Sequence, residues 1–334
     1  MKTVIRALPA LAAQVAQIAL FAALALPAAA RAGEESYQNY DYALAPRRIA
    51  ADTYVLVGRN EDFTPRNGGN IVNTAFIVTD DGVVVIDTGP SRRYGEQLRQ
   101  AIARITDKPV VRVFNTHHHP DHFLGNQAFA APTLAALPGT IDGIRRDGNA
   151  FAENLYRLSG DWMLGTEAVA PAAPVAAGTQ NFGRHRLEAI ADLGHTDADL
   201  VLLDTATGVL FAGDLLFHGR APTTPHADIA HWLAALDHLE RLAASGRVSL
   251  VVPGHGEVAA PAEPIRQTRH YLRWLDATLR QAADDGLDMN EVLALPLPPD
   301  IAALAVSEAE YRRSVGHLFP AIEQEALARH GGRP

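Results

Sequence analysis

The alternation of apolar and polar positions predicts a chain in which the element order strand, strand, helix, strand occurs twice. The first half contains apolar runs of strand length at 53–57, 74–79, 82–87 and 110–115. Ser91 is a typical N-cap residue and predicts a helix that ends near Ile105. The second half repeats the order, with strands at 200–203, 209–212 and 249–252 and a helix at 227–244.

The segment between the halves and the C-terminal segment differ from this pattern. Residues 168–178 are rich in Ala and Pro and show no regular period. From Glu263 onward the pattern is helical, with a break at 295–299 before the last helix. We therefore predict an α/β fold of two similar halves, with sheets inside, helices outside and strand-end loops that face one crevice.

The N-terminal residues have the pattern of a secretory signal rather than of a folded element. Lys2 and Arg6 precede an apolar stretch of 16 residues at 11–26, and small residues at 30 and 32 provide a cleavage site. A membrane anchor is the alternative, but a span needs about 20 apolar residues. We predict a signal peptide at 1–32 and an exported protein without a stable membrane anchor, periplasmic in a Gram-negative source.

Composition narrows the classes of function. The chain has 334 residues, 48% of them hydrophobic and 20% charged, which is typical of a globular protein. It has no cysteine, so disulfides, thiolate metal sites and a catalytic cysteine are excluded. A formal net charge of −9 argues against nucleic acid as a partner and leaves a small-molecule substrate.

A histidine-rich segment follows the predicted strand at 110–115. It contains His117, His118, His119, Asp121 and His122. In an extended loop, residues two apart project to the same side, so His117, His119 and Asp121 are expected to converge while His122 turns to an adjacent point. Imidazoles this close together repel when protonated unless something neutralises them, which favours a metal site.

Three further residues are expected at the same crevice. His195, Asp214 and His255 each lie directly after or between apolar, strand-like runs. Strand ends of paired sheets bring such residues together. Nitrogen and oxygen ligands without sulfur suit zinc and are acceptable to iron or manganese.

The combined pattern resembles the metallo-β-lactamase-fold hydrolase superfamily: His-x-His-x-Asp-His at 117–122, Gly-His at 194–195, Gly-Asp at 213–214 and Pro-Gly-His-Gly at 253–256. The resemblance implies an αβ/βα four-layer sandwich at 33–262, followed by a helical C-terminal extension at 263–334. It also implies two Zn²⁺ ions per chain, one held by His117, His119 and His195, the other by Asp121, His122 and His255, with Asp214 bridging them. His118 matches no ligand position, and Asp87 matches an aspartate that supports the ligands.

Within the superfamily, the chain looks most like the SoxH-type zinc metallohydrolases of quinoprotein relay systems. This likeness rests on the run at 68–74, on the segment 213–217 and on the secretion signal. It implies an exported hydrolase and a functional association with a periplasmic quinoprotein dehydrogenase. It does not imply a physiological substrate.

The resemblance implies hydrolysis of an ester or thioester carbonyl by a metal-bridging hydroxide. Asp121 is the candidate general acid or base, in addition to its role as a ligand. The segment after Asp214 is expected to overhang the crevice, where Arg220 would bind a substrate carboxylate and His218 is a weaker substrate contact. Asp199 is expected to be a solvated surface residue.

Several alternatives stay open at this point. A β-lactamase is the runner-up, although Asp214 stands where those enzymes usually have Cys or Ser. A glyoxalase II-like thioesterase fits Asp214 and the helical tail. Its glutathione-binding basic residues are not recognisable in the sequence, although Arg312 and Arg313 leave the point open. A mononuclear iron persulfide dioxygenase shares part of the motif. A non-catalytic accessory protein of a quinoprotein system is the alternative outside enzymes, and its usual sign, loss of metal ligands, is missing here.

Overall fold

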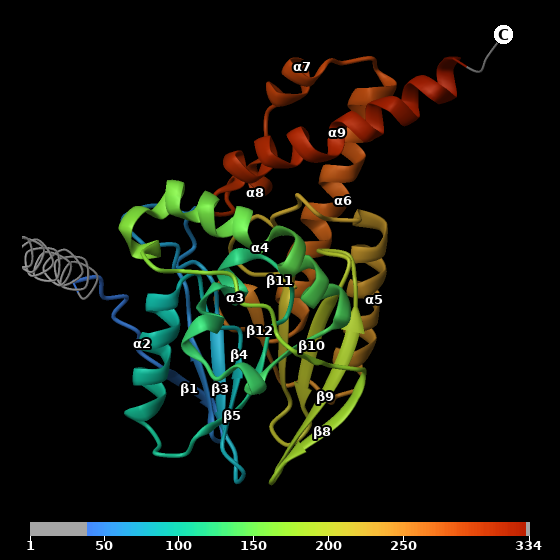
Figure 1. The fold of residues 1–334 in the computed structure, drawn as a ribbon. Coiled ribbons are helices and arrows are strands. Elements are labelled where there is room, and N and C mark those ends of the chain that lie inside the picture. Colours follow the sequence, from blue (N-terminus) through green and yellow to red (C-terminus); the bar gives the residue numbers. More distant parts are fainter. Residues whose placement is uncertain (1–38, 332–334) are drawn as a thin grey trace, which may run out of the picture. The chain divides into compact units, whose positions relative to one another are not determined.

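The structure is a computed structural model that describes residues 39–331. The predicted signal peptide at 1–32 lies outside these residues. Two sheets form the centre of the fold (Figure 1). The first has the strand order β1-β2-β3-β4-β5-β6-β7: Arg47–Ala50, Thr53–Leu56, Thr74–Val78, Val83–Ile86, Val110–Phe114, Leu134–Ala136 and Ala173–Pro174. The second has the order β12-β11-β10-β9-β8: Leu250–His255, Val209–Phe217, Asp199–Asp204, His185–Asp192 and Gly178–Phe182.

Each sheet combines antiparallel and parallel pairs. Strands β1 to β4 are antiparallel, and β4 to β7 are parallel. In the second sheet, β8 to β11 are antiparallel, and β11 pairs in parallel with β12. Parallel pairs need crossover connections, and these carry helices that cover the outer faces of the sheets. Central strands such as β4 and β10 are therefore buried on both sides and mostly apolar.

The helices are α2 Arg92–Ala103, α3 Pro120–Phe123, α4 Pro138–Ser159, α5 Ile229–Ala244, α6 Ala262–Asp284, α7 Met289–Leu293, α8 Pro299–Ala302 and α9 Ser307–Gly331. Short 3-10 helices lie at Leu124–Ala128, Ala131–Thr133 and Gly160–Met163. As predicted, Ser91 caps α2, because its side chain accepts a hydrogen bond from the Tyr94 amide. Among residues 39–331, no helix has both the length and the apolar content that crossing a membrane requires.

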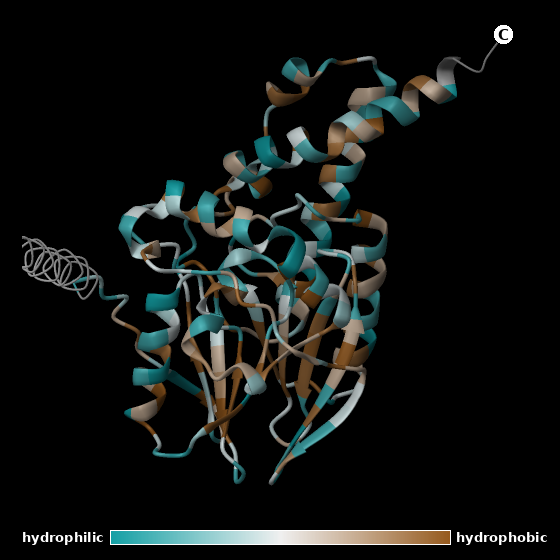
Figure 2. Cartoon of the chain, in the orientation of Figure 1, coloured by the Kyte–Doolittle hydropathy of each residue, from teal (hydrophilic) through white to brown (hydrophobic). Residues whose placement is uncertain are grey.

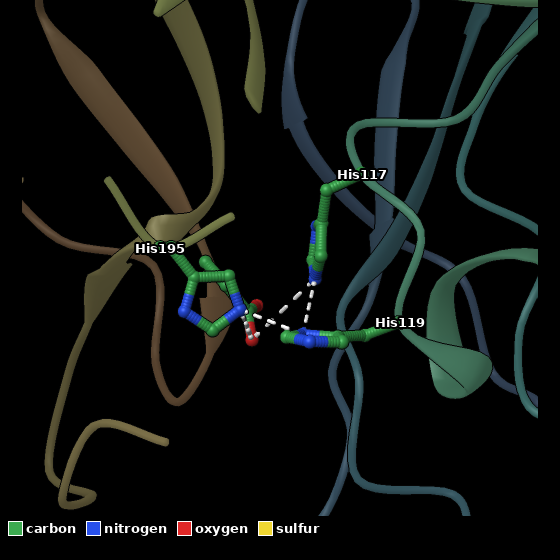
Figure 3. A group of neighbouring side chains, drawn as sticks. His117, His119 and His195 are labelled. Atoms are coloured by element: carbon green, nitrogen blue, oxygen red, sulfur yellow. Dashed lines mark hydrogen bonds and ion pairs between the residues drawn. The ribbon is translucent and has the colours of Figure 1, made fainter. Parts of the chain in front are cut away.

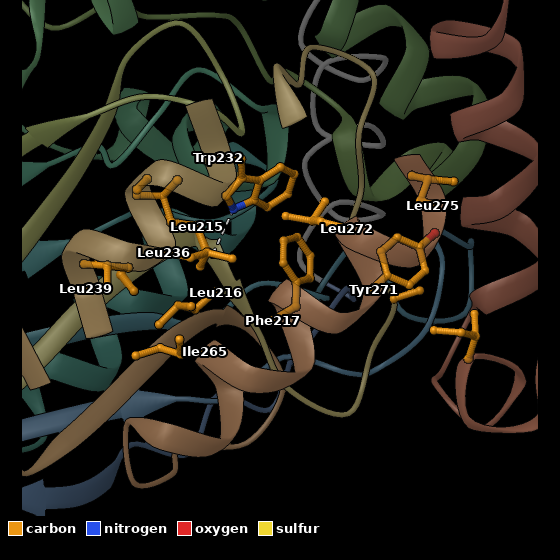
Figure 4. Close-up of a cluster of buried hydrophobic side chains, with 14 of the residues drawn as sticks. Leu215, Leu216, Phe217, Trp232, Leu236, Leu239, Ile265, Tyr271, Leu272 and Leu275 are labelled. Carbon is orange, nitrogen blue, oxygen red and sulfur yellow. Dashed lines mark hydrogen bonds between the residues drawn. The ribbon is translucent and has the colours of Figure 1, made fainter. Parts of the chain in front are cut away.

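Three apolar clusters show the order of the layers. Val84 and Ile86 of β4 face Leu200 and Leu202 of β10 in the cluster between the sheets. Side chains alternate along a strand, so Val83 and Val85 point the other way and pack against α2. The outer face of the second sheet packs against α5, α6 and α9, and Figures 2 and 4 show these apolar strands and the cluster beside them. The four-layer sandwich predicted from the sequence is confirmed.

The region between the two halves is more regular than predicted. α4 has 22 residues, and the chain then forms the hairpin of β8 and β9. Glycines at 139, 143 and 148 weaken the helical signal of α4, but they let the helix approach its neighbours closely. At Gly143, for example, a Cβ atom would lie 2.7 Å from the ring of His118. The sequence of strand β9 did contain a strand pattern, since polar residues alternate with Leu187 and Ala189. In the structure these two residues and His185 are buried.

Candidate metal centre

The seven residues predicted as metal ligands come from both sheets and the segments that follow their strands, and all are buried. His117 and His119 follow β5, and Asp121 and His122 lie on α3. His195 lies in the turn between β9 and β10. The remaining two, Asp214 and His255, lie on β11 and β12. The structure thus brings together residues that are up to 138 positions apart in the sequence, and we call these seven side chains the ligand cluster.

The first group of the cluster consists of three imidazoles that face one another (Figure 3). The Nδ1 atom of His119 lies 3.1 Å from His117 Nε2 and 2.8 Å from His195 Nε2. One ring nitrogen cannot form good hydrogen bonds with two others when only neutral rings are present. A cation between the three nitrogens fits this geometry, because each ring then offers a lone pair.

The second group consists of Asp121, His122 and His255. The Oδ2 atom of Asp121 lies 3.4 Å from His255 Nε2 and 3.7 Å from His122 Nε2. Within residues 39–331, Asp121 Oδ2 and His122 Nε2 are buried without a hydrogen-bond partner. Buried polar atoms are costly when they lack a partner. These two atoms therefore fit a second cation.

Asp214 lies between the two groups. Its Oδ2 atom is 3.4 Å from His195 Nε2 and 3.2 Å from His255 Nε2. Its Oδ1 atom is 3.1 Å from His122 Nε2. One carboxylate thus contacts ligands of both groups, which is the arrangement expected of a residue that bridges two cations.

The outward ring nitrogens have partners that fix the orientation of the imidazoles. Asp87 Oδ2 lies 2.8 Å from His122 Nδ1 and also accepts a hydrogen bond from the Thr116 hydroxyl. That hydroxyl lies 3.0 Å from His117 Nδ1, and the carbonyl of Ile71 lies 2.7 Å from His255 Nδ1. In each case the proton is held on Nδ1, so Nε2 presents its lone pair to the centre. The supporting role implied for Asp87 agrees with this geometry.

Burial controls the protonation of the first group. It lowers the pKa values of His117 and His119 well below 6.5 and that of His195 to about 3. These rings are therefore neutral at neutral pH, which is the form that binds a cation.

Opposite charges control the protonation of the second group. Burial alone would lower the pKa of His122, but the carboxylates of Asp214, Asp121 and Asp87 raise it well above 6.5. Burial also disfavours the charged form of Asp214 and would raise its pKa, but His255 and His122 hold the pKa well below 3.8. The carboxylate is thus ionised, and a cation is a natural substitute for the proton on His122.

Two predictions about the loops were wrong. Asp121 does not converge with His117 and His119, because α3 begins at Pro120 and the alternation of an extended chain ends there. Asp199 is not a solvated residue: it is buried, and its Oδ2 atom accepts hydrogen bonds from the amides of His195 and Thr196. It therefore shapes the turn that carries a ligand.

The ligand cluster lies beside a cavity of about 410 Å³. Residues of α4, of the loop 218–226 and of α9 line it, and we call them the cavity wall: Phe151, Asn154, Leu155, Leu158, Arg220, Thr223, Pro225, His226, Glu310, Arg313 and His317. Phe63 and Ile71 complete the lining next to His119, Asp121, Asp214 and His255. The residues of α4 were not predicted as lining residues, because helix α4 itself was not predicted. Glu310 lies on the predicted C-terminal helices, but no local motif indicated that it would contact Arg220.

The two predicted substrate residues occupy different positions. Arg220 lines the cavity but is only 1% exposed, and its guanidinium donates to Glu310 Oε1 at 3.1 Å. Its charge is therefore paired already. His218 is not among the described residues that line the cavity, and its ring contacts the carbonyl of Glu257 and the carboxylate of Glu263. Substrate contact by either residue stays a prediction.

The sequence signature of the metallo-beta-lactamase superfamily matches residues 67–255. The chain belongs to this superfamily. Its relatives in the superfamily include a linear primary-alkylsulfatase of a Pseudomonas species, 25% identical over 305 residues that cover 78% of this chain and 56% of that protein. They also include a hydroxyacylglutathione hydrolase of a Cyanothece species, 27% identical over 184 residues that cover 51% of this chain and 64% of that protein. The chain thus spans less than two thirds of the length of these relatives.

Solved structures of superfamily members share the fold. The sec-alkylsulfatase Pisa1 from Pseudomonas superimposes with a TM-score of 0.61 at 18% identity, over 87% of this chain and 51% of that chain. A metallo-beta-lactamase from Pontibacter korlensis superimposes with a TM-score of 0.55 at 20% identity, over 69% of this chain and 99% of that chain. The alkylsulfatase likeness covers more of this chain than the β-lactamase likeness does.

Proposed function

We propose that this protein is an exported metallohydrolase that holds two divalent cations, with zinc the preferred metal, and hydrolyses an ester or thioester of a small molecule. One observation carries the proposal. Asp214 contacts ligands of two groups, His117, His119 and His195 on one side and Asp121, His122 and His255 on the other, beside a cavity of about 410 Å³. Curated hydrolases among the relatives support the same class of reaction.

When bound by these residues, two divalent cations would supply a water of lowered pKa and would polarise the bond that is cleaved. The chain supplies the rest of the centre. Asp87, Thr116 and the Ile71 carbonyl hold protons on the outward nitrogens of three ligand rings, so the cluster is organised before substrate arrives. The carboxylates of Asp121 and Asp214 offset part of the positive charge and leave a site that favours an anionic transition state.

Asp121 is the proposed general acid or base. Its Oδ2 atom lacks a hydrogen-bond partner within the described part of the chain, and the residue lines the cavity. A carboxylate oxygen in this position can accept a proton from the attacking water and return it to the leaving group. Its closeness to His255 and His122 means that metal binding and proton transfer compete for the same side chain.

The cavity lining suggests a substrate with an apolar part. The lining includes the apolar side chains of Phe63, Phe151, Leu155 and Leu158. The charges of the cavity wall are largely paired with each other, since Glu310 Oε1 contacts both Arg220 and Arg313. An acyl chain or aromatic group beside the scissile bond fits this lining. Within the described residues the buried Nε of Arg220 has no hydrogen-bond partner, which keeps a substrate carboxylate as a candidate ligand of this residue.

A sulfate ester is the second candidate. The alkylsulfatase relative matches 78% of this chain, more than the 51% that the hydroxyacylglutathione hydrolase matches. Alkyl sulfates also combine an apolar chain with a hydrolysable polar head, and the cavity offers both environments. β-Lactam hydrolysis and a non-catalytic accessory role are the remaining alternatives.

The cellular setting is proposed from the sequence. The signal pattern at 1–32 favours export to the periplasm, and the likeness to SoxH-type proteins favours a functional association with a quinoprotein dehydrogenase. The complete set of ligand residues supports an enzyme over an accessory protein.

Metal analysis and a substrate panel test the proposal. Purified mature protein is expected to contain two equivalents of zinc and to hydrolyse thioesters and phenyl esters of increasing acyl length, with KM falling as the chain lengthens. The same panel includes a primary alkyl sulfate and a cephalosporin. Turnover of the sulfate alone would favour the second candidate, and turnover of the cephalosporin alone would favour a β-lactamase. Protein that binds no divalent metal and cleaves none of the four would contradict the proposed function.

A further inference from the structure

A second histidine cluster adjoins the metal centre. His118, His119 and His226 offer ring nitrogens that lie within 4.8 Å of one another. His226 comes from the loop between β11 and α5, far in sequence from the other two, and it lines the cavity. Only His119 belongs to the ligand cluster, so the role of His226 needs a separate explanation.

The two nitrogens of His119 face different partners. Nδ1 faces His117 and His195 at 3.1 and 2.8 Å and is therefore the atom that would bind a cation. A neutral ring with a free lone pair on Nδ1 carries its proton on Nε2. His119 Nε2 lies 2.8 Å from His226 Nδ1, which is a normal hydrogen-bond distance. His226 Nδ1 is then the acceptor, and His226 carries its own proton on Nε2.

The loop that carries His226 is held on both sides. The hydroxyl of Thr224 donates to Ser314 on α9 at 2.7 Å. On the other side, the amide of Asp228 donates to the carbonyl of Gly194 at 2.9 Å, directly before the ligand His195. These bonds fix the loop between α9 and the turn that carries His195. The backbone position of His226 is therefore determined by the fold.

Neighbouring rings restrict His226 further. Its ring centroid lies 5.2 Å from that of His118 and 6.1 Å from that of Phe151 on α4. Gly143 on the same helix lets α4 approach His118 closely. Contact with α4 therefore limits the movement of the His226 ring next to His119. In this orientation Nδ1 of His226 points towards Nε2 of His119.

We propose that His226 is a positioning residue of the metal centre: by accepting the Nε2 proton of His119, it holds that ligand in the tautomer and orientation that a cation requires. Metal-binding histidines usually donate their outer N–H to a carboxylate, a carbonyl or water. Here the partner is a second imidazole that also lines the substrate cavity. The inference rests on the metal centre of the proposed function.

The test compares two replacements at this position. In His226→Ala the acceptor is lost, and we expect the affinity for one of the two cations to fall by about 10- to 100-fold. In His226→Gln a carbonyl oxygen can accept the same hydrogen bond, and we expect most of the affinity to be retained. Affinity is measured by competition between the protein and a chelator for Zn²⁺, and the absorption spectrum of the Co²⁺ form reports the ligand geometry.

The control is His317→Ala. His317 lines the same cavity, but it lies on α9 and forms no hydrogen bond to a ligand histidine within residues 39–331. Its replacement should leave both the Zn²⁺ affinity and the Co²⁺ spectrum unchanged. His226 is exposed, so neither of its replacements creates a buried void.

Three outcomes would overturn the inference. Wild-type affinity and spectrum in His226→Ala would show that His119 needs no acceptor from this residue. Equal losses in His226→Gln and His226→Ala would show that the ring matters for packing and not as an acceptor. An equal loss in His317→Ala would assign the effect to the cavity as a whole. Wild-type protein that binds no zinc would instead contradict the proposed function itself.

Discussion

The ligand cluster and the cavity wall are adjacent, but they are built differently. Six of the seven ligand residues lie in strand-end loops, in α3 or at the end of a strand, and short motifs carry them. The wall comes from α4, the loop 218–226 and α9, which have no such motif. The cluster consists of buried imidazoles and carboxylates, some of whose atoms have no hydrogen-bond partner among the described residues, whereas the wall combines apolar side chains with polar groups such as the Arg220–Glu310 ion pair. The comparison suggests that the cluster determines the chemistry and the wall determines the substrate.

The strongest way to separate the two regions is Asp214→Ala in the cluster. This change removes the carboxylate that contacts ligands of both groups. We expect metal content to fall from about two equivalents to about one and kcat to fall by at least 100-fold, since ligand losses exceed the 10- to 100-fold effects of supporting residues. Metal analysis and steady-state kinetics check both expectations. Two equivalents of metal with unchanged kcat would remove the bridging role of Asp214.

A smaller effect on metal content and kcat is expected from Glu310→Gln in the wall, because this change acts on the stability of the fold. Glu310 is fully buried, and its Oε1 atom contacts Arg220, Arg313 and Thr223. Replacing it leaves a buried guanidinium without its counter-charge, which costs about 3–5 kcal/mol when a buried pair is broken. Urea unfolding should show this loss while the metal content stays at two equivalents. If the variant lost metal at unchanged stability, the wall and the cluster would not be separable.

The smallest effect is expected at a carboxylate outside both regions. Asp204 is buried, and its Oδ2 atom lies 2.8 Å from His185 Nδ1 and accepts from the Thr207 hydroxyl. Burial raises the pKa of Asp204, but these hydrogen bonds outweigh it and hold the pKa below 3.8. The ionised carboxylate therefore stabilises the fold at neutral pH, and this contribution is lost as the pH falls below about 4.

Asp204→Asn should accordingly lower the free energy of unfolding by about 1–3 kcal/mol at pH 7. The difference from wild type should shrink as the pH falls below about 4 and towards the lowered pKa of Asp204 in the folded state, because the carboxylate of the unfolded chain is protonated first and the folded state then loses its advantage. Unfolding curves at several pH values measure the difference, and metal content and kcat should not change. A difference that stayed constant with pH would show that the charge of Asp204 does not contribute.

Local patterns were sufficient to predict much of this molecule. Strands such as Thr74–Val78 and Val83–Ile86 are buried on both faces, so their apolar runs are unambiguous. The fold class follows from the repeated element order and the motifs. The sequence pattern did not predict helix α4, because its glycines lower the helix propensity. In the structure Gly143 and Gly148 allow close contact with His118 and Ala168. The pattern also failed for Asp199, because burial of that carboxylate depends on the turn that folds over it.

By itself, the sequence determined which residue types stand at the strand ends, since motif spacing and apolar runs are properties of neighbouring positions. The family resemblance implied that Asp121 shares a group with His122 and His255, but local spacing placed it with His117 and His119, and the tertiary structure decided between the two. It also decided that Glu310 of α9 pairs with Arg220 in the cavity wall and that His226, from the loop before α5, reaches the ligand His119. The physical reason is that a side chain's partners, burial and protonation depend on elements far away in the chain, and these meet only when the two sheets and their helices pack together.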